Sequence, residues 1–541
     1  MKFRELLIVA ISFLLLTFNL GSWGITETSE SRYAEISREM LVNNDYVHPK
    51  LLGIHHYHKP PITYQITTLG YKIFGVNEFG ARFFLQIAII IQLLLVYHIA
   101  LLLFNKKSMA FTSMLIYFSL PIVLISSRNL TTDAYLTTTV LASVFFWLYY
   151  KLKGLKPIYI YLFFLMLGLS FEIKGPVGLL FPLVFIICYK VVLKDKFKIT
   201  SHHVLGVLLF LVVSFMWYIV VFIENPILYN YFFKEQIVNR ISAKSYNRSK
   251  PFWFYIATVP AIGLPWIFFI IHQCIKKFKT IKSERSYAFI LLISTSIILV
   301  LFSIFKTKLI LYVLPSFGFI AILAAKLLSN TSENLLKKYQ NIIIGFTLLI
   351  AVAFLVVVML DIDFKFQLFT AIIILIIAAT SITYIIKHKT LSNYIKTGYL
   401  GFVFGAIILI SGTQFLKLND AQLNSTKKVF EFVNNELPNK QNIVVYNYLL
   451  ASAQFYSDKN VITLNDGHNT VQRETQFETN DQWKDYNLNL STEGGKKQAK
   501  QVLEHNAVLI TRKKRDLPDY YSYLRQPLPH RPEIGTWVIY Y

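Results

Sequence analysis

The polar segment 27–61 holds the side chains best suited to chemistry, because it combines carboxylates, an arginine, histidines and a lysine beside two prolines. Glu27, Glu30 and Arg32 lie near its start, and Lys59 lies near its end. A group transfer from a phosphate carrier to a hydroxyl needs a base to take the proton and a cation to hold the leaving phosphate. Charges at the end of an apolar helix are costly unless they pair or act. We therefore expect Glu30 or Glu27 to be catalytic and Arg32 and Lys59 to bind phosphate.

A structural interpretation of the same residues stays open. Ser29 or Ser31 can cap a helix that begins here, and acidic residues in the first turn are favoured by the helix dipole. The following stretch, RYAEISREML, is amphipathic and needs no catalytic role to explain its charges. Spacing alone does not choose between the two interpretations of Glu27 and Glu30.

Three histidines, His55, His56 and His58, directly precede Lys59. Neutral imidazole is a common metal ligand, which makes His58 a candidate ligand of a divalent metal. Their spacing matches no known helical metal site. The alternative is a polar loop at the membrane interface, in which the paired prolines stiffen the chain and hold Lys59 at a defined height for phosphate.

Two further lysines, Lys174 and Lys308, lie at the ends of apolar runs on the side of the membrane that positive charge avoids. An anionic carrier phosphate would explain both, and snorkelling toward lipid headgroups is the alternative. Tyr312 lies four residues after Lys308, on the same face of a helix.

Asp133 is an acid at the mouth of an apolar run and could pair with Arg128 or Lys59, or act as a second catalytic carboxylate. The segment 224–250 alternates aromatic and charged residues, which indicates an amphipathic helix at the membrane interface. Arg240 and Arg248 are then available for lipid phosphates.

Membrane helices must position these residues. Of the 541 residues, 55% are hydrophobic and 16% are charged, which is typical of a membrane protein and not of a soluble domain. Apolar runs of about 17–22 residues recur, each long enough to cross a bilayer. We predict about thirteen transmembrane helices, near 5–22, 83–104, 109–126, 132–150, 158–173, 176–193, 203–223, 251–272, 286–304, 309–328, 341–360, 367–386 and 398–416.

The net charge of +24 does not indicate a nucleic-acid partner, because the lysines cluster in short loops between the apolar runs. That pattern is the positive-inside signal and also suits anionic membrane lipids. It predicts a cytoplasmic N-terminus and places the loops 23–82 and 224–250, with everything after 417, on the outer face. The first apolar run could instead be a cleaved signal peptide.

The composition becomes polar near residue 417. Short apolar runs at 443–446, 461–464, 508–511 and 537–541 indicate strands, and 427–437 and 496–505 have the period of amphipathic helices. The stretch 466–495 is predicted to be looped. We therefore predict two domains, a mainly α membrane domain at 1–417 and a small extracytoplasmic α/β domain at 418–541.

Several motifs together resemble those of a known family. They are SESRYAEISREM (29–40), KPP (59–61), IFG (73–75) with Arg82, Lys174-Gly175, PFW (251–253), LPW (264–266) and Lys308 with Tyr312 and Pro315. In this order they resemble the bacterial GT-C membrane glycosyltransferases related to protein O-mannosyltransferases and to the lipid A aminoarabinose transferases. The likeness covers about 25–320; the later spans and the tail match only in layout.

The resemblance implies a GT-C fold and an inverting transfer from a polyprenyl-phosphate sugar at the outer face of the inner membrane. We expect Lys59, Lys174, Lys308 and Arg32 to hold the carrier phosphate, with Tyr312 assisting. Arg82 and Arg240 are further candidates for substrate binding. The acceptor stays open between lipid A, another glycolipid and a protein hydroxyl. A lipid-sugar flippase and a scaffold without activity are the alternatives.

Three positions depart from the family pattern. The first acid of the family's acidic pair is Ser29 here, so Glu30 or Glu27 has taken over its role or the usual assignment fails. The family's acid that helps to hold a metal is His58 here, and a histidine of its second loop corresponds to Gln236.

Overall fold

The structure is a computed structural model that describes residues 3–27, 29–154, 156–196, 198–233, 249–283, 286–360, 362–467 and 470–541. It divides into two compact units. The first consists of Met1–Phe18, Leu85–Asp361 and Phe366–Thr413, and the second of Asn19–Phe84, Ile362–Lys365 and Gln414–Tyr541. The polar loop 23–82 therefore packs with the C-terminal tail in one unit. The predicted functional division at 417 stays a prediction.

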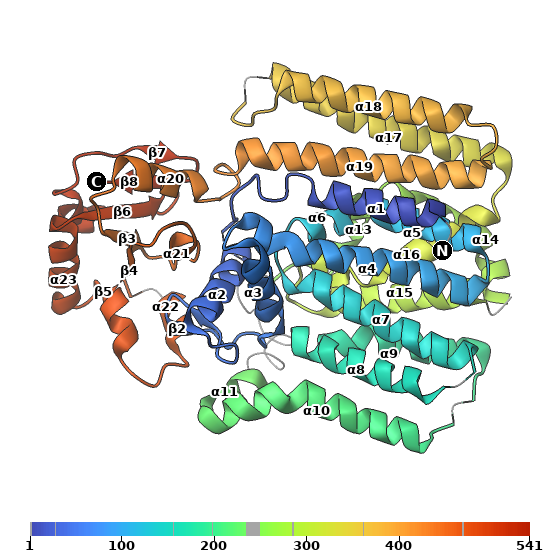
Figure 1. Cartoon of the computed structure of the whole chain (residues 1–541), viewed down its shortest axis with the longest axis horizontal. Coiled ribbons are helices and arrows are strands. Elements are labelled where there is room, and N and C mark those ends of the chain that lie inside the picture. The colour runs from blue at the N-terminus through green and yellow to red at the C-terminus, as the bar shows by residue number, and fades with distance from the viewer. Residues whose placement is uncertain are drawn as a thin grey trace. The chain divides into compact units, whose positions relative to one another are not determined.

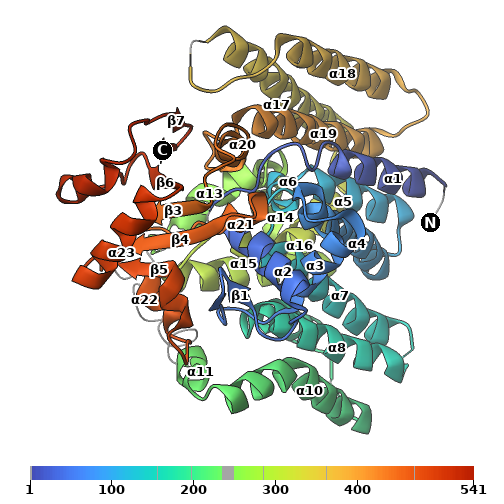
Figure 2. The same cartoon turned by 60° about the vertical axis from the view of Figure 1, so that its left-hand side comes forward.

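The first unit is built from helices, because a chain in lipid must satisfy its backbone hydrogen bonds within each segment. Figures 1 and 2 show α17, α18 and α19 running side by side in this unit. Its helices are α1 (Phe3–Thr17), most of α4 (Glu78–Phe104), α5 (Lys107–Ser119), α6 (Pro121–Ser127), α7 (Thr132–Leu152), α8 (Pro157–Lys174), α9 (Val177–Leu193), α10 (Ser201–Glu224), α11 (Ile227–Asn230), α13 (Phe254–Ile262), α14 (Trp266–Ser283), α15 (Tyr287–Ile304), η2 (Ile310–Val313), α16 (Ser316–Ser329), α17 (Glu333–Met359), α18 (Leu368–Lys387) and most of α19 (Asn393–Asn419).

Each of the thirteen predicted spans contains a helix. Within the described residues, seven helices are long and apolar enough to cross a membrane, and the number rises to nine if two bent helix pairs each count as one span. The bent pairs are α5 with α6 (63°) and α13 with α14 (112°), and α9 and α16 are shorter apolar helices. The chain is therefore a multi-pass membrane protein with a mainly α fold.

The N-terminal part of the second unit begins with α2 (Ser29–Asn43), which packs against α3 (Ile62–Phe74). A two-stranded antiparallel ribbon, β1 (Lys50–Leu51) and β2 (Ile54–His55), lies between them in the chain. The Thr68 hydroxyl donates to the Ser37 carbonyl (2.9 Å), and the Tyr71 hydroxyl donates to the Ala34 carbonyl (3.0 Å). These buried contacts fix the face of α2 that carries Glu35.

The tail forms a six-stranded sheet in the order β5-β4-β3-β6-β8-β7. The four neighbouring strands β5, β4, β3 and β6 are parallel, and β8 pairs antiparallel with β6 and β7. The four predicted strands and two predicted helices are present as β3 (Asn442–Tyr446), β4 (Asn460–Asn465), β6 (Ala507–Arg512), β8 (Trp537–Tyr540), α20 (Lys427–Glu436) and α23 (Glu493–Glu504). The strand β7 (Glu533–Ile534), the short helix α21 (Ala453–Tyr456) and η4 (Asp519–Arg525) were not predicted.

The stretch 466–495 is more regular than the predicted loop. It contains α22 (Thr470–Thr475), η3 (Gln482–Tyr486) and β5 (Asn487–Asn489). These elements are short and polar, and their pairing depends on residues elsewhere in the tail, so the local pattern gives little sign of them.

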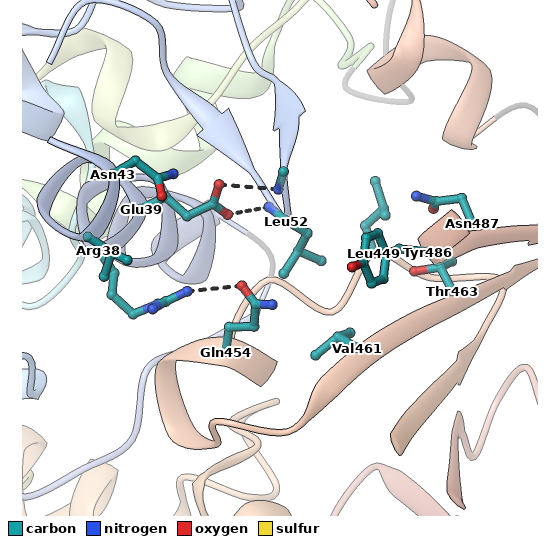
Figure 3. Close-up of a pocket in the computed structure, with 12 residues that line it drawn as sticks. Arg38, Glu39, Asn43, Leu52, Leu449, Gln454, Val461, Thr463, Tyr486 and Asn487 are labelled. Atoms are coloured by element: carbon teal, nitrogen blue, oxygen red, sulfur yellow. Dashed lines mark hydrogen bonds between the residues drawn. The ribbon is translucent and has the colours of Figure 1, made fainter. Parts of the chain in front are cut away.

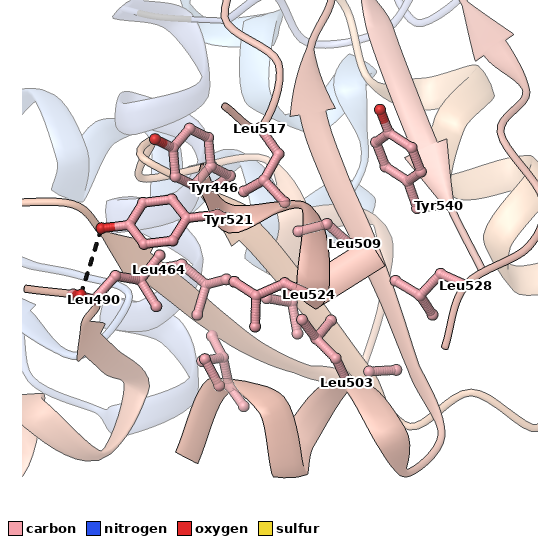
Figure 4. Close-up of a cluster of buried hydrophobic side chains, with 14 of the residues drawn as sticks. Tyr446, Leu464, Leu490, Leu503, Leu509, Leu517, Tyr521, Leu524, Leu528 and Tyr540 are labelled. Atoms are coloured by element: carbon pink, nitrogen blue, oxygen red, sulfur yellow. Dashed lines mark hydrogen bonds between the residues drawn. The ribbon is translucent and has the colours of Figure 1, made fainter. Parts of the chain in front are cut away.

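The sheet is apolar on both faces. Alternate side chains of a strand point to opposite faces, and in the central strands both sets are apolar. Val444 and Tyr446 belong to one buried cluster, and Ile443 and Val445 belong to the other. Figure 4 shows the first cluster, in which Leu464 and Leu509 of the central strands lie with leucines of α23 and η4.

Candidate functional site

Three predicted site residues of the first unit come together at the ends of their elements. Asp133 lies in the first turn of α7, Lys174 is the last residue of α8, and Tyr312 lies in η2. The Lys174 ammonium donates to Asp133 Oδ1 and lies 4.4 Å from the centre of the Tyr312 ring. Asp133 thus pairs with Lys174, a partner that the sequence analysis did not name. A buried cation over an aromatic face, beside one carboxylate, suits the binding of an anion.

Helix α8 ends at Gly175, whose φ of +70° is a conformation that glycine adopts without strain. The Gly175 N–H donates to the Phe171 carbonyl and closes the last turn. This ending leaves Lys174 on the terminal turn, where its side chain reaches Asp133.

Lys308 is only 2% exposed, although it carries a charge. Its ammonium donates to the backbone carbonyls of Lys250 (3.0 Å) and Phe305. Among the described residues no carboxylate lies within ion-pair distance of it. A buried ammonium held by neutral carbonyls has no counter-charge, which suits the predicted contact with a phosphate.

In the second unit, Glu30 forms a buried ion pair with Arg82. The Arg82 Nε and Nη2 atoms donate to the two Glu30 oxygens at 2.8 and 3.0 Å, and the Thr26 N–H donates to the same carboxylate (2.9 Å). The other donors of Arg82 bind the carbonyls of residues 20, 23 and 24, so all five of its N–H groups are used. These contacts favour a structural role for Glu30 and Arg82, and their predicted roles at the substrate stay predictions.

Glu27 is also buried and committed to internal contacts. It accepts hydrogen bonds from the Ser31 hydroxyl (2.8 Å), the Tyr448 hydroxyl (3.0 Å) and the Ser452 N–H (2.9 Å). Two of these donors belong to the tail. Glu27 therefore joins the loop to the tail domain, and its predicted catalytic role stays untested.

Arg32 is partly exposed, and within the part of the chain that the structure describes no carboxylate pairs with it. Its charge acts on His56 and on Tyr448. Lys59 belongs to the same unit and is partly buried. Lys174, Lys308 and Tyr312 belong to the other unit, so the convergence of all these cations on one phosphate stays a prediction.

The His56 and His58 rings face the carboxylate of Glu474 in α22. His56 Nδ1 lies 3.2 Å and His58 Nε2 lies 2.9 Å from Glu474 Oε2, and all three ligand atoms lie within 4.8 Å of one another. Burial lowers the pKa of His56 and lowers that of His58 to about 3, so both rings are neutral near pH 7. Burial opposes the charge of Glu474, but the two histidines outweigh it and hold its pKa well below the usual range.

The cluster pairs a predicted metal ligand, His58, with a carboxylate that the sequence did not point to. Glu474 lies 416 residues further along the chain. No local signal identified it, because α22 follows a polar stretch without helical periodicity. The donor set of two imidazoles and one carboxylate could hold a divalent metal.

A recess of about 310 Å³ opens beside α2, between the loop and the tail of the second unit (Figure 3). Arg38 donates to both Glu35 oxygens (2.9 and 2.8 Å) and to the Gln454 side chain (2.9 Å) at this recess. Glu39 accepts from the N–H groups of Leu52 and Gly53. Burial raises the pKa of Glu35 to about 8. From the sequence, Glu35 was expected only to be one charge of an amphipathic helix.

Three residues of the second outer loop lie outside the described residues. They are Gln236, Arg240 and Arg248. Their predicted roles stay predictions.

A protein-family model described as dolichyl-phosphate-mannose-protein mannosyltransferase matches residues 2–230. An undecaprenyl phosphate-α-4-amino-4-deoxy-L-arabinose arabinosyl transferase of Proteus mirabilis is 30% identical over 360 residues, which are 65% of each chain. A transferase of that name from Photorhabdus laumondii is 31% identical over 58% of each chain. The chain thus matches less than two thirds of the length of these two relatives.

A crystal structure of ArnT from Cupriavidus metallidurans bound to undecaprenyl phosphate covers 99% of this chain and 97% of its own, with a TM-score of 0.79 and 19% identity. The apo form of that protein gives a TM-score of 0.76. The resemblance to the GT-C membrane glycosyltransferases is confirmed. The GT-C fold explains the helical first unit, and the match extends over the tail domain, which the sequence motifs did not cover.

Proposed function

We propose that this GT-C protein is an enzyme that moves a sugar, with inversion, from a polyprenyl-phosphate carrier to lipid A or another envelope acceptor. The observation that carries the proposal is the partly buried cluster of Asp133, Lys174 and Tyr312. The names of the relatives support an undecaprenyl-phosphate donor, and an amino sugar is the first donor to test.

The reaction needs a cation for the leaving phosphate and a base for the acceptor. The acceptor oxygen attacks the anomeric carbon from the face opposite the carrier, the carbon–oxygen bond to the phosphate breaks, and the phosphate leaves with the electron pair. Lys174, with Lys308, Arg32 and Lys59 as further candidates, stabilises the charge that develops there.

Asp133 is the best placed acceptor of the proton among the three candidate carboxylates. Glu27 and Glu30 each accept three internal hydrogen bonds. Asp133 Oδ2, within the described residues, accepts only a long contact from the Thr131 hydroxyl (3.3 Å). Lys174 holds the other oxygen and orients the group. The Asp133 carboxylate therefore keeps lone pairs for an incoming hydroxyl.

We propose that the N-terminus is cytoplasmic and the second unit is extracytoplasmic in the inner membrane. The lysine clusters of the short loops support this orientation. The variants Lys153→Cys and Lys428→Cys test this orientation when each is treated with a membrane-impermeant thiol reagent. In intact cells only the cysteine of Lys428→Cys should react.

The activity is tested with the full chain in detergent, supplied with an undecaprenyl-phosphate amino sugar and lipid A, with product measured by mass spectrometry. Asp133→Asn and Lys174→Met should lower turnover by at least about 100-fold, because each removes a charge that acts in the transition state. Lys151→Met is the matched control, since Lys151 forms a similar pair with Asp195 (2.9 Å) at the other end of α7.

Detergent removes any gradient, so a flippase would give no product in this assay. An inactive wild type that still binds the donor would overturn the proposed transfer. Folded Asp133→Asn and Lys174→Met variants with wild-type turnover would place the site elsewhere.

A further inference from the structure

We propose that His56, His58 and Glu474 bind a divalent metal such as zinc, which ties the loop 23–82 to the tail domain. The three donors come from two segments that are far apart in the chain: the stretch after β2, and α22. All three belong to the second unit, and Glu474 is 3% exposed. The family pattern places an acid at position 58 and a histidine in the second loop, so this donor set differs from it.

The spacing of the donors fits a metal. In a tetrahedral site with bonds of about 2.0–2.1 Å, neighbouring ligand atoms lie about 3.4 Å apart. The observed separations of 3.2 and 2.9 Å between the imidazole nitrogens and Glu474 Oε2 are slightly shorter. A modest outward movement of the side chains would admit an ion. Two imidazoles and one carboxylate leave a fourth position open for water.

Arg473 bears on the site in two ways. It pairs with Glu474 Oε1, whereas His56 and His58 contact Oε2, and so it helps to orient the carboxylate with Oε2 toward the rings. A partner of this kind behind a ligating carboxylate is usual at metal sites. Its positive charge, with that of Arg32, weakens the attraction for a cation. Arg473 is one third exposed, so water screens part of this effect.

A cluster joined only by hydrogen bonds is the competing explanation. In that case each ring donates an N–H to the same oxygen, and the carboxylate is satisfied without an ion. The neighbouring pair of His55 and Glu478 has this simpler form, with Nδ1 and Oε1 2.9 Å apart and a second hydrogen bond from the His55 N–H. It joins the same loop to the same part of the tail. It offers one ring instead of two and serves as an internal control.

The metal would act on the position of Lys59. His58 directly precedes Lys59, and Pro60 and Pro61 follow it, so a ligated His58 would leave the lysine little freedom. This consequence rests on the proposed role of Lys59 in binding phosphate. Metal binding itself does not rest on that role and is measured separately.

The test uses the full chain in detergent, stripped with a chelator, dialysed against zinc sulfate and freed of unbound metal. We expect about one zinc per chain by mass spectrometry. Glu474→Gln keeps the shape of the side chain but removes the anionic ligand, and His58→Ala removes an imidazole. Each should lower bound zinc by at least about tenfold. Glu478→Gln disrupts the control pair and should leave the zinc content unchanged.

Two further readouts separate a lost site from a misfolded variant. Zinc should raise the melting temperature of the wild type and of Glu478→Gln, but not that of Glu474→Gln. Cobalt in place of zinc should give the visible absorption of a four-coordinate nitrogen and oxygen site. A wild type that binds no zinc, or a Glu474→Gln variant that binds it fully, would overturn the proposed metal site and leave the proposed transferase activity untouched.

Discussion

Glu35 shows how packing changes the chemistry of a single residue. On the printed sequence it is one acid of an amphipathic helix. In the structure it is fully buried, and desolvation outweighs the hydrogen bonds from Arg38 and raises its pKa from 4.5 to about 8. At neutral pH the folded protein therefore keeps a proton on Glu35 that the unfolded chain releases.

We predict that this proton makes the second unit less stable as pH rises. The folded state binds more protons than the unfolded state between pH 4.5 and 8, so the free energy of unfolding falls by up to about 1.4 kcal/mol per pH unit. His58 has the opposite effect below pH 6.5, because its pKa is lowered in the folded state. Melting temperatures should thus be compared between pH 6.5 and 8.

Glu35→Gln should remove most of this decrease, because glutamine carries no titratable proton and can still accept from Arg38. His55→Ala is a suitable control, since it leaves the decrease in place. A Glu35→Gln variant with the slope of the wild type would show that Glu35 is ionised in the folded protein.

At the scale of the elements, the Glu30–Arg82 pair fixes α2 to α4. Both ends are buried, and Arg82 also binds three carbonyls of the chain between α1 and α2. Loss of one partner leaves a buried charge without compensation. The pair therefore couples α2, which carries the SESRYAEISREM motif, to the start of α4.

We predict that Arg82→Met lowers the free energy of unfolding by about 3–5 kcal/mol. The double variant Glu30→Met/Arg82→Met should recover part of this loss, since the lone carboxylate is gone while the three carbonyls stay unpaired. Thermal unfolding in detergent measures both. Equal destabilisation of the single and the double variant would argue against the ion pair as the cause.

A change at the Glu30–Arg82 pair also tests whether Glu30 has a structural or a catalytic role. Folded Glu30→Gln should keep more than about a tenth of the wild-type turnover if the carboxylate is structural, whereas loss of a catalytic base costs about 100-fold or more. Turnover per folded molecule decides between them. A loss of that size would return Glu30 to the catalytic role that its motif suggests.

At the scale of the whole molecule, the second unit is assembled from the ends of the chain. The tail supplies two donors to Glu27, and the Tyr456 hydroxyl accepts from the Ile25 N–H (2.6 Å) and donates to Glu78 (3.1 Å). Lys427 pairs with Glu78 as well (3.0 Å). The loop that carries Arg32 and Lys59 is thus held in place by the tail.

We predict that a chain ending at residue 417 inserts into the membrane but leaves the loop 23–82 open to protease. Glu27 and Glu78 lose the partners that the tail supplies, while the apolar spans do not depend on the tail. Limited proteolysis followed by mass spectrometry maps the cuts, with the full chain as reference. A loop as resistant in the truncated chain as in the full one would show that the tail is dispensable for its fold.

Much of the fold could be predicted because its signals are local. Thirteen apolar runs lie over helices, and the runs at 443–446 and 508–511 lie over β3 and β6, since hydropathy and periodicity depend on neighbouring residues. The short elements of 466–495 escaped because their polar residues carry no such pattern. The helix bends between α5 and α6 and between α13 and α14 were also not expected from hydropathy.

For the site, residue types could be predicted but partners could not. Asp133 and Lys174 were each singled out, and the structure joins them across 41 residues. Glu30 was assigned a catalytic role and Arg82 a substrate-binding role, and they bind each other. Glu474 carried no signal at all.

The sequence by itself therefore determined a multi-pass membrane chain with a small α/β tail, because lipid selects for apolar length and strands for alternation. It also carried motifs that resemble those of the GT-C glycosyltransferases. Only the tertiary structure decided which carboxylates are committed to internal partners, that the buried Lys308 donates to backbone carbonyls, and which histidines share a carboxylate. These properties depend on contacts between residues tens to hundreds of positions apart, and burial sets their charge.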